Sequence, residues 1–220
     1  LHGRHQSGPI AKGEGGGRGL VEDVSQGTPH SVPIRLLPID EPLRAEIRVP
    51  GDKSISHRAL FLAGVNRGST MLHGLAPGAD VRSTIDVLTR LGVAIEVDGD
   101  EARIQAANPR ELSADIRKDV TDLYCGNSGT TARLLCGYLA GERGLYRITG
   151  DESLSSRPMD RVVDPLASMG MEISATAGHL PIHAIVSRAA SMHADRSFEC
   201  DASSAQVHAA VLLAALRSGV

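Results

Sequence analysis

Residues 51–58 read Gly-Asp-Lys-Ser-Ile-Ser-His-Arg, and the rest of the chain is organised around this stretch. A glycine turn brings one lysine, two serines and one arginine to the beginning of an apolar helix. Serine oxygens cap helix N-termini well, and the unpaired N–H groups there attract anions. Lys53 and Arg58 add positive charge at the same end. The stretch predicts a site for a small phosphate or carboxylate ligand, although an ordinary capped helix with a basic first turn would look the same.

Composition limits what such a site can bind. The chain has 220 residues, a formal net charge of −3, 41% hydrophobic residues, only 2% aromatic residues and no tryptophan. This predicts one large domain or two small ones around an aliphatic core, and it argues against a nucleic-acid binder, which needs aromatic stacking surfaces and general positive charge. The longest apolar run, residues 209–216, is too short to span a membrane, and no signal peptide is visible.

The cysteines and histidines do not indicate a metal site. The sequence has an odd number of cysteines, without the spacing of metal ligands: Cys125, Cys136 and Cys200. We therefore expect reduced thiols in a cytoplasmic protein. Residues 1–33 are rich in glycine and polar residues and are predicted to form a flexible N-terminal tail, with a first domain over residues 34–220. The histidines scattered in that tail are expected to be solvated. They are His2, His5 and His30.

Hydrophobic periodicity predicts alternating strands and helices after the tail. Strict alternation over residues 43–49 indicates a half-buried strand, and the helix from Lys53 is expected to end near residues 64–68. The pattern then predicts a strand over 70–73, a helix over 81–91, and strands over 93–97 and 102–106 joined by an Asp98-Gly99 hairpin turn.

The same series recurs later in the chain. Gly126 and Arg133 open another apolar helix, 75 residues after Gly51 and Arg58 respectively. The pattern then predicts a strand over 145–149, a helix over 159–169, and strands over 171–174 and 180–184. A third unit begins at residues 201–206. Internal repetition of this length is a strong organising signal. If the units pack around a pseudo-threefold axis, their helix N-termini would point to one end of the domain.

Four motifs in order and register resemble the 5-enolpyruvylshikimate-3-phosphate (EPSP) synthase family of the shikimate pathway. They lie at residues 53–58, 126–130, 157–159 and 204–207, and the resemblance covers residues 43–220. It implies an inside-out α/β barrel domain of βαββαβ units, with the third unit truncated here. It also implies transfer of the carboxyvinyl group of phosphoenolpyruvate (PEP) to shikimate 3-phosphate, with release of phosphate and with no metal or organic cofactor.

The resemblance also assigns roles to single residues. Lys53 would contact both substrates, and Ser54 and Arg58 would hold the shikimate carboxylate. Arg157 and the backbone around Gly129 would hold the PEP phosphate. Ser204 would bind the shikimate phosphate, and Gln206 would lie between the substrates. Asn127 and Thr130, in the second motif, complete the expected substrate-binding set.

The acid–base carboxylates of the family, a lysine and an arginine pair lie in a second half that this sequence does not contain. We therefore expect a fragment that carries most of the first domain, comes from a cytoplasmic and monomeric enzyme, and does not turn over alone. Ala205 replaces a phosphate-binding serine of many members, and Leu134 stands where many have proline. Both resemble the second, often glyphosate-tolerant class, whereas the small Gly129 leaves room for that inhibitor, so sensitivity stays open.

Three other interpretations remain. An enolpyruvyl transferase acting on UDP-N-acetylglucosamine shares the fold, but its first motif carries Lys-Asn, so Ser54 and Arg58 argue against it. A non-catalytic anion-binding half-domain would use the same residues. A purely structural repeat would leave the cationic motifs unexplained.

Overall fold

The computed structural model describes residues 46–47, 49–66, 68–106, 119–187 and 204–218, and a single compact unit extends from Ile47 onward. The predicted tail over residues 1–33, the start of the domain at residue 34, and Cys200 lie outside the described residues. Those expectations stay predictions.

The described elements follow the predicted repeat. The first repeat contains α1 (Lys53–Val65), β1 (Ser69–His73), α2 (Ala79–Arg90), β2 (Ala94–Asp98) and β3 (Glu101–Gln105). The second contains β4 (Val120–Tyr124), α3 (Gly129–Tyr138), the 3-10 helix η1 (Leu139–Gly141), β5 (Gly144–Thr149), α4 (Glu152–Ser155), α5 (Asp160–Ser168), β6 (Glu172–Thr176) and β7 (His179–Val186). Helix α6 (Ala205–Ser218) belongs to the predicted third unit.

Three expectations need correction. The described part of the stretch 43–49 forms no strand, because it has no hydrogen-bonded strand neighbour there, and Ile47 and Val49 are exposed. Strand β4 and the single turn of α4 were not anticipated. The second repeat reads strand–helix–strand–helix–strand–strand, because the hairpin of β6 and β7 follows α5 rather than preceding it. The order is therefore βαβαββ and not βαββαβ.

The two repeats build two related sheets. Strands β1, β3 and β2 form an antiparallel sheet in that order, and β5, β7 and β6 repeat the same arrangement in a second sheet. Strand β4 extends the second sheet by pairing with β5 in parallel. Because β4 directly precedes α3, its end delivers the chain to the beginning of that helix.

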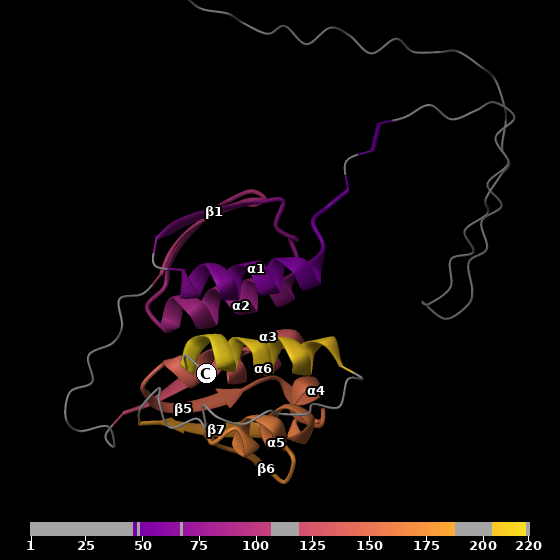
Figure 1. Cartoon of the computed structure of the whole chain (residues 1–220). Helices are drawn as coiled ribbons and strands as arrows, with labels where there is room; N and C mark the ends of the chain where they lie inside the picture. The colour runs from indigo at the N-terminus through magenta and orange to yellow at the C-terminus, as the bar shows by residue number, and fades with distance from the viewer. Residues whose placement is uncertain (1–45, 48, 67, 107–118, 188–203, 219–220) are drawn as a thin grey trace, which may run out of the picture. The chain divides into compact units, whose positions relative to one another are not determined.

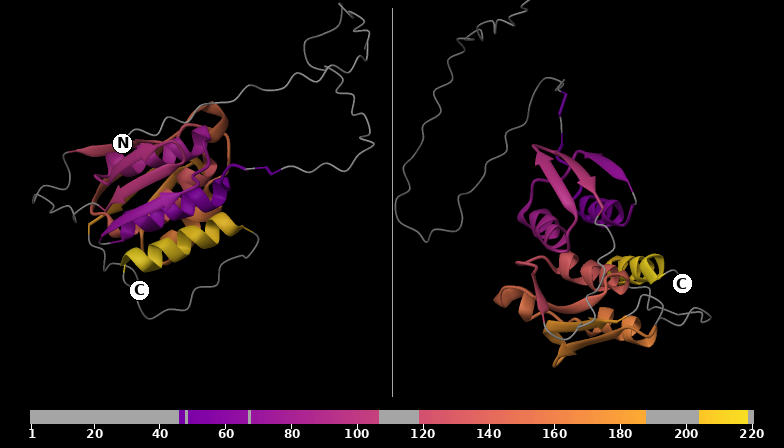
Figure 2. Two further views of the ribbon diagram at one scale, coloured as in Figure 1. Left: turned by 90° about the horizontal axis from the view of Figure 1, so that it is seen from above. Right: turned by 90° about the vertical axis from the view of Figure 1, so that its left-hand side faces the viewer.

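Helices α1, α2, α3 and α6 lie between the two sheets (Figure 1). Helices α1 and α2 cover one face of the first sheet and pack on α3, which pairs with α6, while α5 packs on β6 of the second sheet (Figures 1 and 2). Fully buried side chains of these helices, such as Leu60, Leu88 and Leu135, form one continuous core. Helices inside and sheets outside are the inside-out α/β arrangement that was expected.

Helices α3 and α6 approach each other at a glycine. A Cβ atom placed on Gly137 would lie only 2.0 Å from the carbonyl oxygen of Ala210, so any larger residue would push α6 away. Near the end of α3, Tyr138 donates a hydrogen bond of 3.1 Å to the carbonyl of Gly64 in α1, and Arg217 of α6 lies over the tyrosine ring. These contacts fix α1 and α6 relative to α3.

Candidate anion-binding site

The beginnings of α1, α3 and α6 hold most of the predicted site residues, but the helices are capped differently. Asp52 caps α1, since its carboxylate accepts from the backbone N–H of Ile55 at 2.8 Å. Ser128 caps α3 by accepting from the N–H of Thr131 at 3.1 Å. The expectation that a serine caps the helix beginning at Lys53 is therefore wrong.

This difference decides which helix can attract a ligand through its backbone. A carboxylate at the N-cap already offsets the positive end of the α1 dipole. Helix α3 has a neutral serine cap, so its first N–H groups remain available to an anion. Consequently α1 contributes to the site through its side chains, and α3 through its backbone as well.

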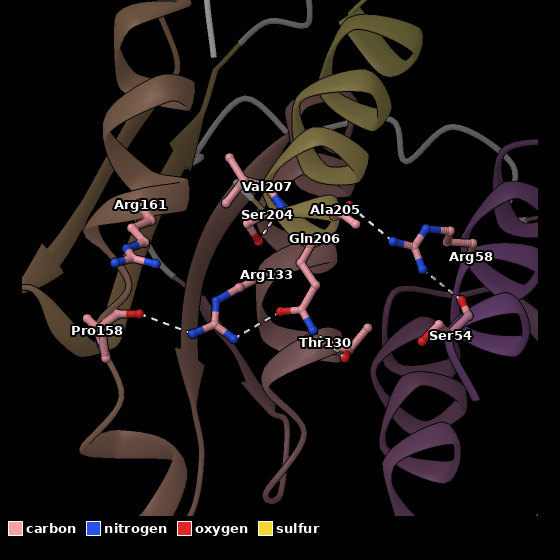
Figure 3. A pocket seen from close by; sticks show the side chains of 10 residues that line it. All are labelled: Ser54, Arg58, Thr130, Arg133, Pro158, Arg161, Ser204, Ala205, Gln206 and Val207. Atoms are coloured by element: carbon pink, nitrogen blue, oxygen red, sulfur yellow. Dashed lines mark hydrogen bonds between the residues drawn. The ribbon is translucent and has the colours of Figure 1, made fainter. Parts of the chain in front are cut away.

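A cavity of about 490 Å³ lies between the starts of the three helices (Figure 3). Its lining includes Ser54, Arg58, Thr130, Ser204 and Gln206, all of them predicted site residues. Arg58 reaches in from α1, and Arg161 reaches in from α5 on the opposite side (Figure 3). The structure thus brings five predicted residues from distant motifs to one cavity, and their binding of substrates stays a prediction.

Hydrogen bonds hold the cations of the cavity in place. The guanidinium of Arg58 donates to the carbonyls of Ser54 at 3.1 Å and Ala205 at 3.0 Å, which links α1 to the start of α6. Arg133 donates to the side-chain oxygen of Gln206 at 3.1 Å, and the amide nitrogen of Gln206 donates to Thr130 at 3.0 Å. Gln206 is thus oriented from both ends of its amide.

Arg157 lies beside the first residue of α3. A Cβ atom on Gly129 would be 3.3 Å from one nitrogen of Arg157 and 2.7 Å from one nitrogen of Arg133, so a larger residue there would displace both guanidinium groups. Arg157 also donates to the side chains of Asn127 and Ser153. The predicted residues Asn127, Gly129 and Arg157 therefore form one contiguous cluster next to the cavity.

The same cluster is anchored by a carboxylate. Asn127 donates to Asp151 at 2.7 Å, and the other oxygen of Asp151 accepts from the N–H of Leu154 at 2.7 Å. Hydrogen bonding by that N–H, more than any other contact, holds the pKa of Asp151 below its ordinary value. The carboxylate therefore stays ionised and keeps Asn127 turned so that its oxygen faces Arg157.

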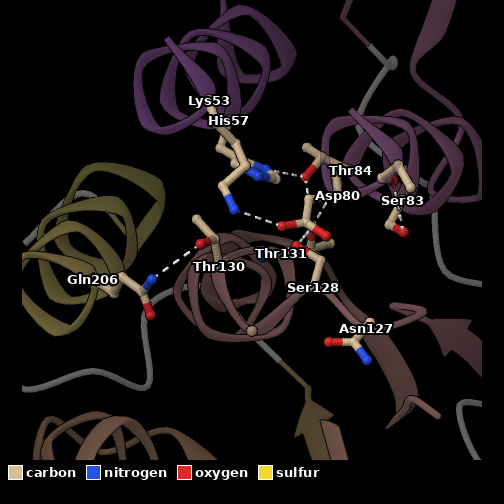
Figure 4. A network of polar contacts seen from close by, with 12 residues as sticks. Lys53, His57, Asp80, Ser83, Thr84, Asn127, Ser128, Thr130, Thr131 and Gln206 are labelled. Carbon is tan, nitrogen blue, oxygen red and sulfur yellow. Dashed lines mark hydrogen bonds and ion pairs between the residues drawn. The ribbon is translucent and has the colours of Figure 1, made fainter. Parts of the chain in front are cut away.

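Lys53 has a partner that the sequence did not reveal. Its ammonium lies 2.8 Å from a carboxylate oxygen of Asp80, in the first turn of α2. Lys53 is the only lysine among the described residues, and slightly more than half of its side chain is exposed. The ammonium is thus held by a counter-ion and still accessible to a ligand (Figure 4).

The cavity is strongly positive. Burial lowers the pKa of Arg133, and the neighbouring Arg157 and Arg161 lower it further by repulsion between like charges. No aspartate or glutamate is among the described residues that line the cavity. Such a cluster of cations is stabilised when an anion enters, because the ligand offsets their mutual repulsion.

Sequence reasoning missed two contributors to this site. Arg161 lines the cavity and Asp80 holds Lys53, but neither was expected to take part. Arg161 lies in the first turn of α5, whereas Arg157 lies before that helix, so no helical spacing connected the two residues. Asp80 lies 27 positions from Lys53, and nothing in the local pattern indicated their contact.

Cys125 and Cys136 are buried, and burial raises the pKa of both thiols, that of Cys136 to about 12. Both are protonated at neutral pH and unsuited to nucleophilic chemistry. Within the part of the chain that the structure describes, no three metal-ligating side chains come together, and no helix has the length and hydrophobicity needed to cross a bilayer.

Fold and site together define an inside-out α/β domain with an arginine-lined cavity where its central helices begin. The chain belongs to the EPSP synthase (3-phosphoshikimate 1-carboxyvinyltransferase) family, whose model matches residues 38–219. It is 43% identical over 176 residues to a 3-phosphoshikimate 1-carboxyvinyltransferase of Lactiplantibacillus plantarum, covering 80% of this chain. A protein of the same name from Streptococcus pyogenes serotype M49 is 44% identical over 179 residues, also covering 80% of this chain.

Solved structures agree. EPSP synthase from Acinetobacter baumannii matches with a TM-score of 0.66 and 34% sequence identity over 76% of this chain and 37% of that chain. The alignments cover 39% and 40% of the two curated relatives. The chain therefore spans about two fifths of the length of the proteins that it resembles.

Proposed function

We propose that this chain supplies one side of the active site of a 3-phosphoshikimate 1-carboxyvinyltransferase. The enzyme would transfer the carboxyvinyl group of PEP to a hydroxyl of shikimate 3-phosphate and release phosphate. The observation that carries the proposal is the convergence of Ser54, Arg58, Thr130, Ser204 and Gln206 on one positive cavity. Both substrates are anions, so bringing them together requires cations that are already in place.

The geometry supports a division of labour among these residues. Arg157 and the backbone N–H groups at Gly129 would hold the PEP phosphate, because the neutral cap of α3 leaves those groups available. Ser54 and Arg58 would take the shikimate carboxylate, and Ser204 the phosphate of shikimate 3-phosphate. Arg161 faces the same cavity as Ser204 and adds positive charge where Ala205 offers no hydroxyl.

Proton transfer is not assigned to any described residue of the cavity, whose lining contains arginines, neutral polar groups and apolar groups. We expect the acid and base to come from the part of the relatives that these alignments do not cover. The cavity of this chain is open to water, which weakens each ionic contact. The chain alone should therefore bind shikimate 3-phosphate weakly, with a dissociation constant on the order of millimolar, and should not catalyse the reaction. For a full-length enzyme we expect a cytoplasmic monomer.

Titration of the chain with shikimate 3-phosphate and PEP, followed by phosphorus NMR, tests the proposal. We expect Lys53→Ala to weaken binding about tenfold or more, because it removes the one described lysine of the site. The control is Arg82→Ala, which removes an exposed cation of α2 outside the cavity lining. Equal affinity of wild type and the Lys53 variant would contradict the assignment, as would steady phosphate release by the chain alone.

A further inference from the structure

Buried polar side chains join α1, α2 and α3 beneath the site (Figure 4). The Nδ1 atom of His57 lies 2.7 Å from the hydroxyl of Thr84, which lies 2.7 Å from the hydroxyl of Thr131. All three residues are fully buried, and none of them lines the cavity. We call this series the His57–Thr84–Thr131 chain. In a buried network of this kind the hydrogen bonds fix a single arrangement of the elements that they connect.

The contacts of Thr131 favour one direction for the hydrogen bonds of the His57–Thr84–Thr131 chain. The hydroxyl of Thr131 lies 3.2 Å from the carbonyl oxygen of Asp80, which can only accept. When Thr131 donates its single hydroxyl proton there, it must accept from Thr84. Thr84 then accepts from the Nδ1–H of His57. This arrangement assigns a neutral imidazole with its proton on Nδ1.

Thr131, at one end of the His57–Thr84–Thr131 chain, reaches two residues that present the site. Asp80 accepts from Thr131 through its backbone and holds the ammonium of Lys53 through its carboxylate. The hydroxyl of Thr131 also lies 2.7 Å from that of Ser128, the N-cap of α3 directly before Gly129. One buried series of hydrogen bonds therefore connects the partner of Lys53 with the backbone expected to hold phosphate.

We propose that His57, Thr84 and Thr131 are positioning residues, which fix the first turn of α2 and the start of α3 so that Asp80 presents Lys53 to the anion site. The role of Lys53 in binding rests on the proposed function above, whereas its positioning by the chain does not. Packing alone does not explain why a histidine is buried at this end of the His57–Thr84–Thr131 chain. Among the described residues the Nε2 atom of His57 has no hydrogen-bond partner, which is unfavourable for a buried polar atom.

The composition of the protein allows a direct test of positioning. The sequence contains only three lysines: Lys12, Lys53 and Lys118. Reductive methylation with ¹³C-formaldehyde therefore gives few ¹³C NMR signals from lysine side chains. The signal that is lost in Lys53→Arg is that of Lys53. Asp80→Asn supplies the reference for a Lys53 amine without its carboxylate.

Thr84→Val removes the hydroxyl at nearly constant shape, and Thr84→Ser keeps it. If the chain positions Lys53, Thr84→Val moves the Lys53 signal towards its position in Asp80→Asn, while Thr84→Ser leaves it at the wild-type position. A Thr84→Val protein that is folded and has an unchanged Lys53 signal would overturn the proposal.

The other end of the chain gives an independent pair of variants in case Thr84→Val does not fold. An asparagine amide can take the place of the Nδ1–H donor, so His57→Asn should leave the Lys53 signal unchanged. His57→Leu fills the space without a donor and should move the signal. An unchanged signal in folded His57→Leu would count against the proposal in the same way.

Ligand binding separates this proposal from the proposed function. With PEP as the probe, Thr84→Val is expected to raise the dissociation constant about tenfold, and Thr84→Ser to keep it near the wild-type value. If wild type binds neither PEP nor shikimate 3-phosphate, the proposed function fails, and the Lys53 signal still decides whether the chain positions that residue. If binding is normal in Thr84→Val although the signal moves, positioning does not serve the binding of PEP and this part of the proposal is wrong.

Discussion

His57 makes the domain sensitive to acid to an extent that the structure allows us to work out. Burial lowers the pKa of this histidine from its ordinary value of 6.5 to about 4; Lys53 and Arg58 lower it further, while Asp80 acts in the opposite direction. In the unfolded chain the imidazole takes up a proton near pH 6.5, but in the folded domain it does so only near pH 4. Stability is therefore unaffected by His57 above pH 6.5 and falls as the pH drops from 6.5 to 4.

The size of the effect follows from that difference in pKa. One unit corresponds to about 1.4 kcal/mol, so the interval between 6.5 and 4 amounts to a loss of about 3 kcal/mol at pH 4. That is a substantial part of the total stability of a small domain. Carboxyl groups also titrate at low pH, so the contribution of His57 must be isolated by comparison with a variant.

The measurement is urea unfolding of wild type and His57→Asn at pH values from 7.5 to 4 in steps of about half a unit. Asparagine keeps a donor for Thr84 and cannot ionise. As the pH falls from 7.5 to 4, the unfolding free energy of wild type should therefore decrease by about 3 kcal/mol more than that of His57→Asn. His183→Asn, at an exposed histidine of β7, is the matched control and should follow wild type. Parallel pH curves for wild type and His57→Asn would refute the reasoning.

Gly137→Ala should lower the unfolding free energy by about 1–3 kcal/mol, because its Cβ meets the backbone of Ala210 in α6; urea unfolding of Gly78→Ala, whose Cβ meets open space, should show a smaller loss. Cys125 should resist iodoacetamide in the native protein and react after denaturation, as followed by mass spectrometry of its peptide, because the thiol is buried and its pKa is raised; rapid native labelling would contradict this. Arg161→Gln should weaken binding of shikimate 3-phosphate and reduce its dependence on salt, whereas Arg82→Gln should do neither.

The sequence predicted most of the secondary structure because each repeat carries local signals. Glycines after α2 and α5, the Asp98-Gly99 turn and the alternation in β3 are short-range features, and the structure confirms the elements that they indicated. The strand expected over residues 43–49 shows the limit of such signals. Alternation indicates only that a segment can pair, whereas a strand needs a hydrogen-bonded neighbour, and none lies beside the described residues Glu46, Ile47 and Val49.

The residues of the candidate site could be predicted where a short sequence motif marks them. They could not be predicted where they depend on contacts between different helices. The four motifs named Ser54, Arg58, Thr130, Ser204 and Gln206, which line the cavity together. Asp80, Thr84 and Thr131 carry no motif of their own, and their importance comes from the packing of α2 against α1 and α3. A contact of that kind depends on how elements from two repeats are placed, which local sequence does not specify.

The chain has a net charge of −3, so the proposed binding of dianionic ligands depends on an uneven distribution of charge around the helix starts. Acidic groups neutralise α1: Asp52 occupies its N-cap, and Asp80 pairs with Lys53. Helix α3 instead begins with a neutral serine beside Arg133 and Arg157. The positive potential is therefore concentrated towards α3, while Lys53 stays balanced until a ligand competes with Asp80 for its ammonium. Because a ligand must displace one carboxylate there and none at α3, the phosphate of PEP should be held at α3 and reach Lys53 only with its other atoms.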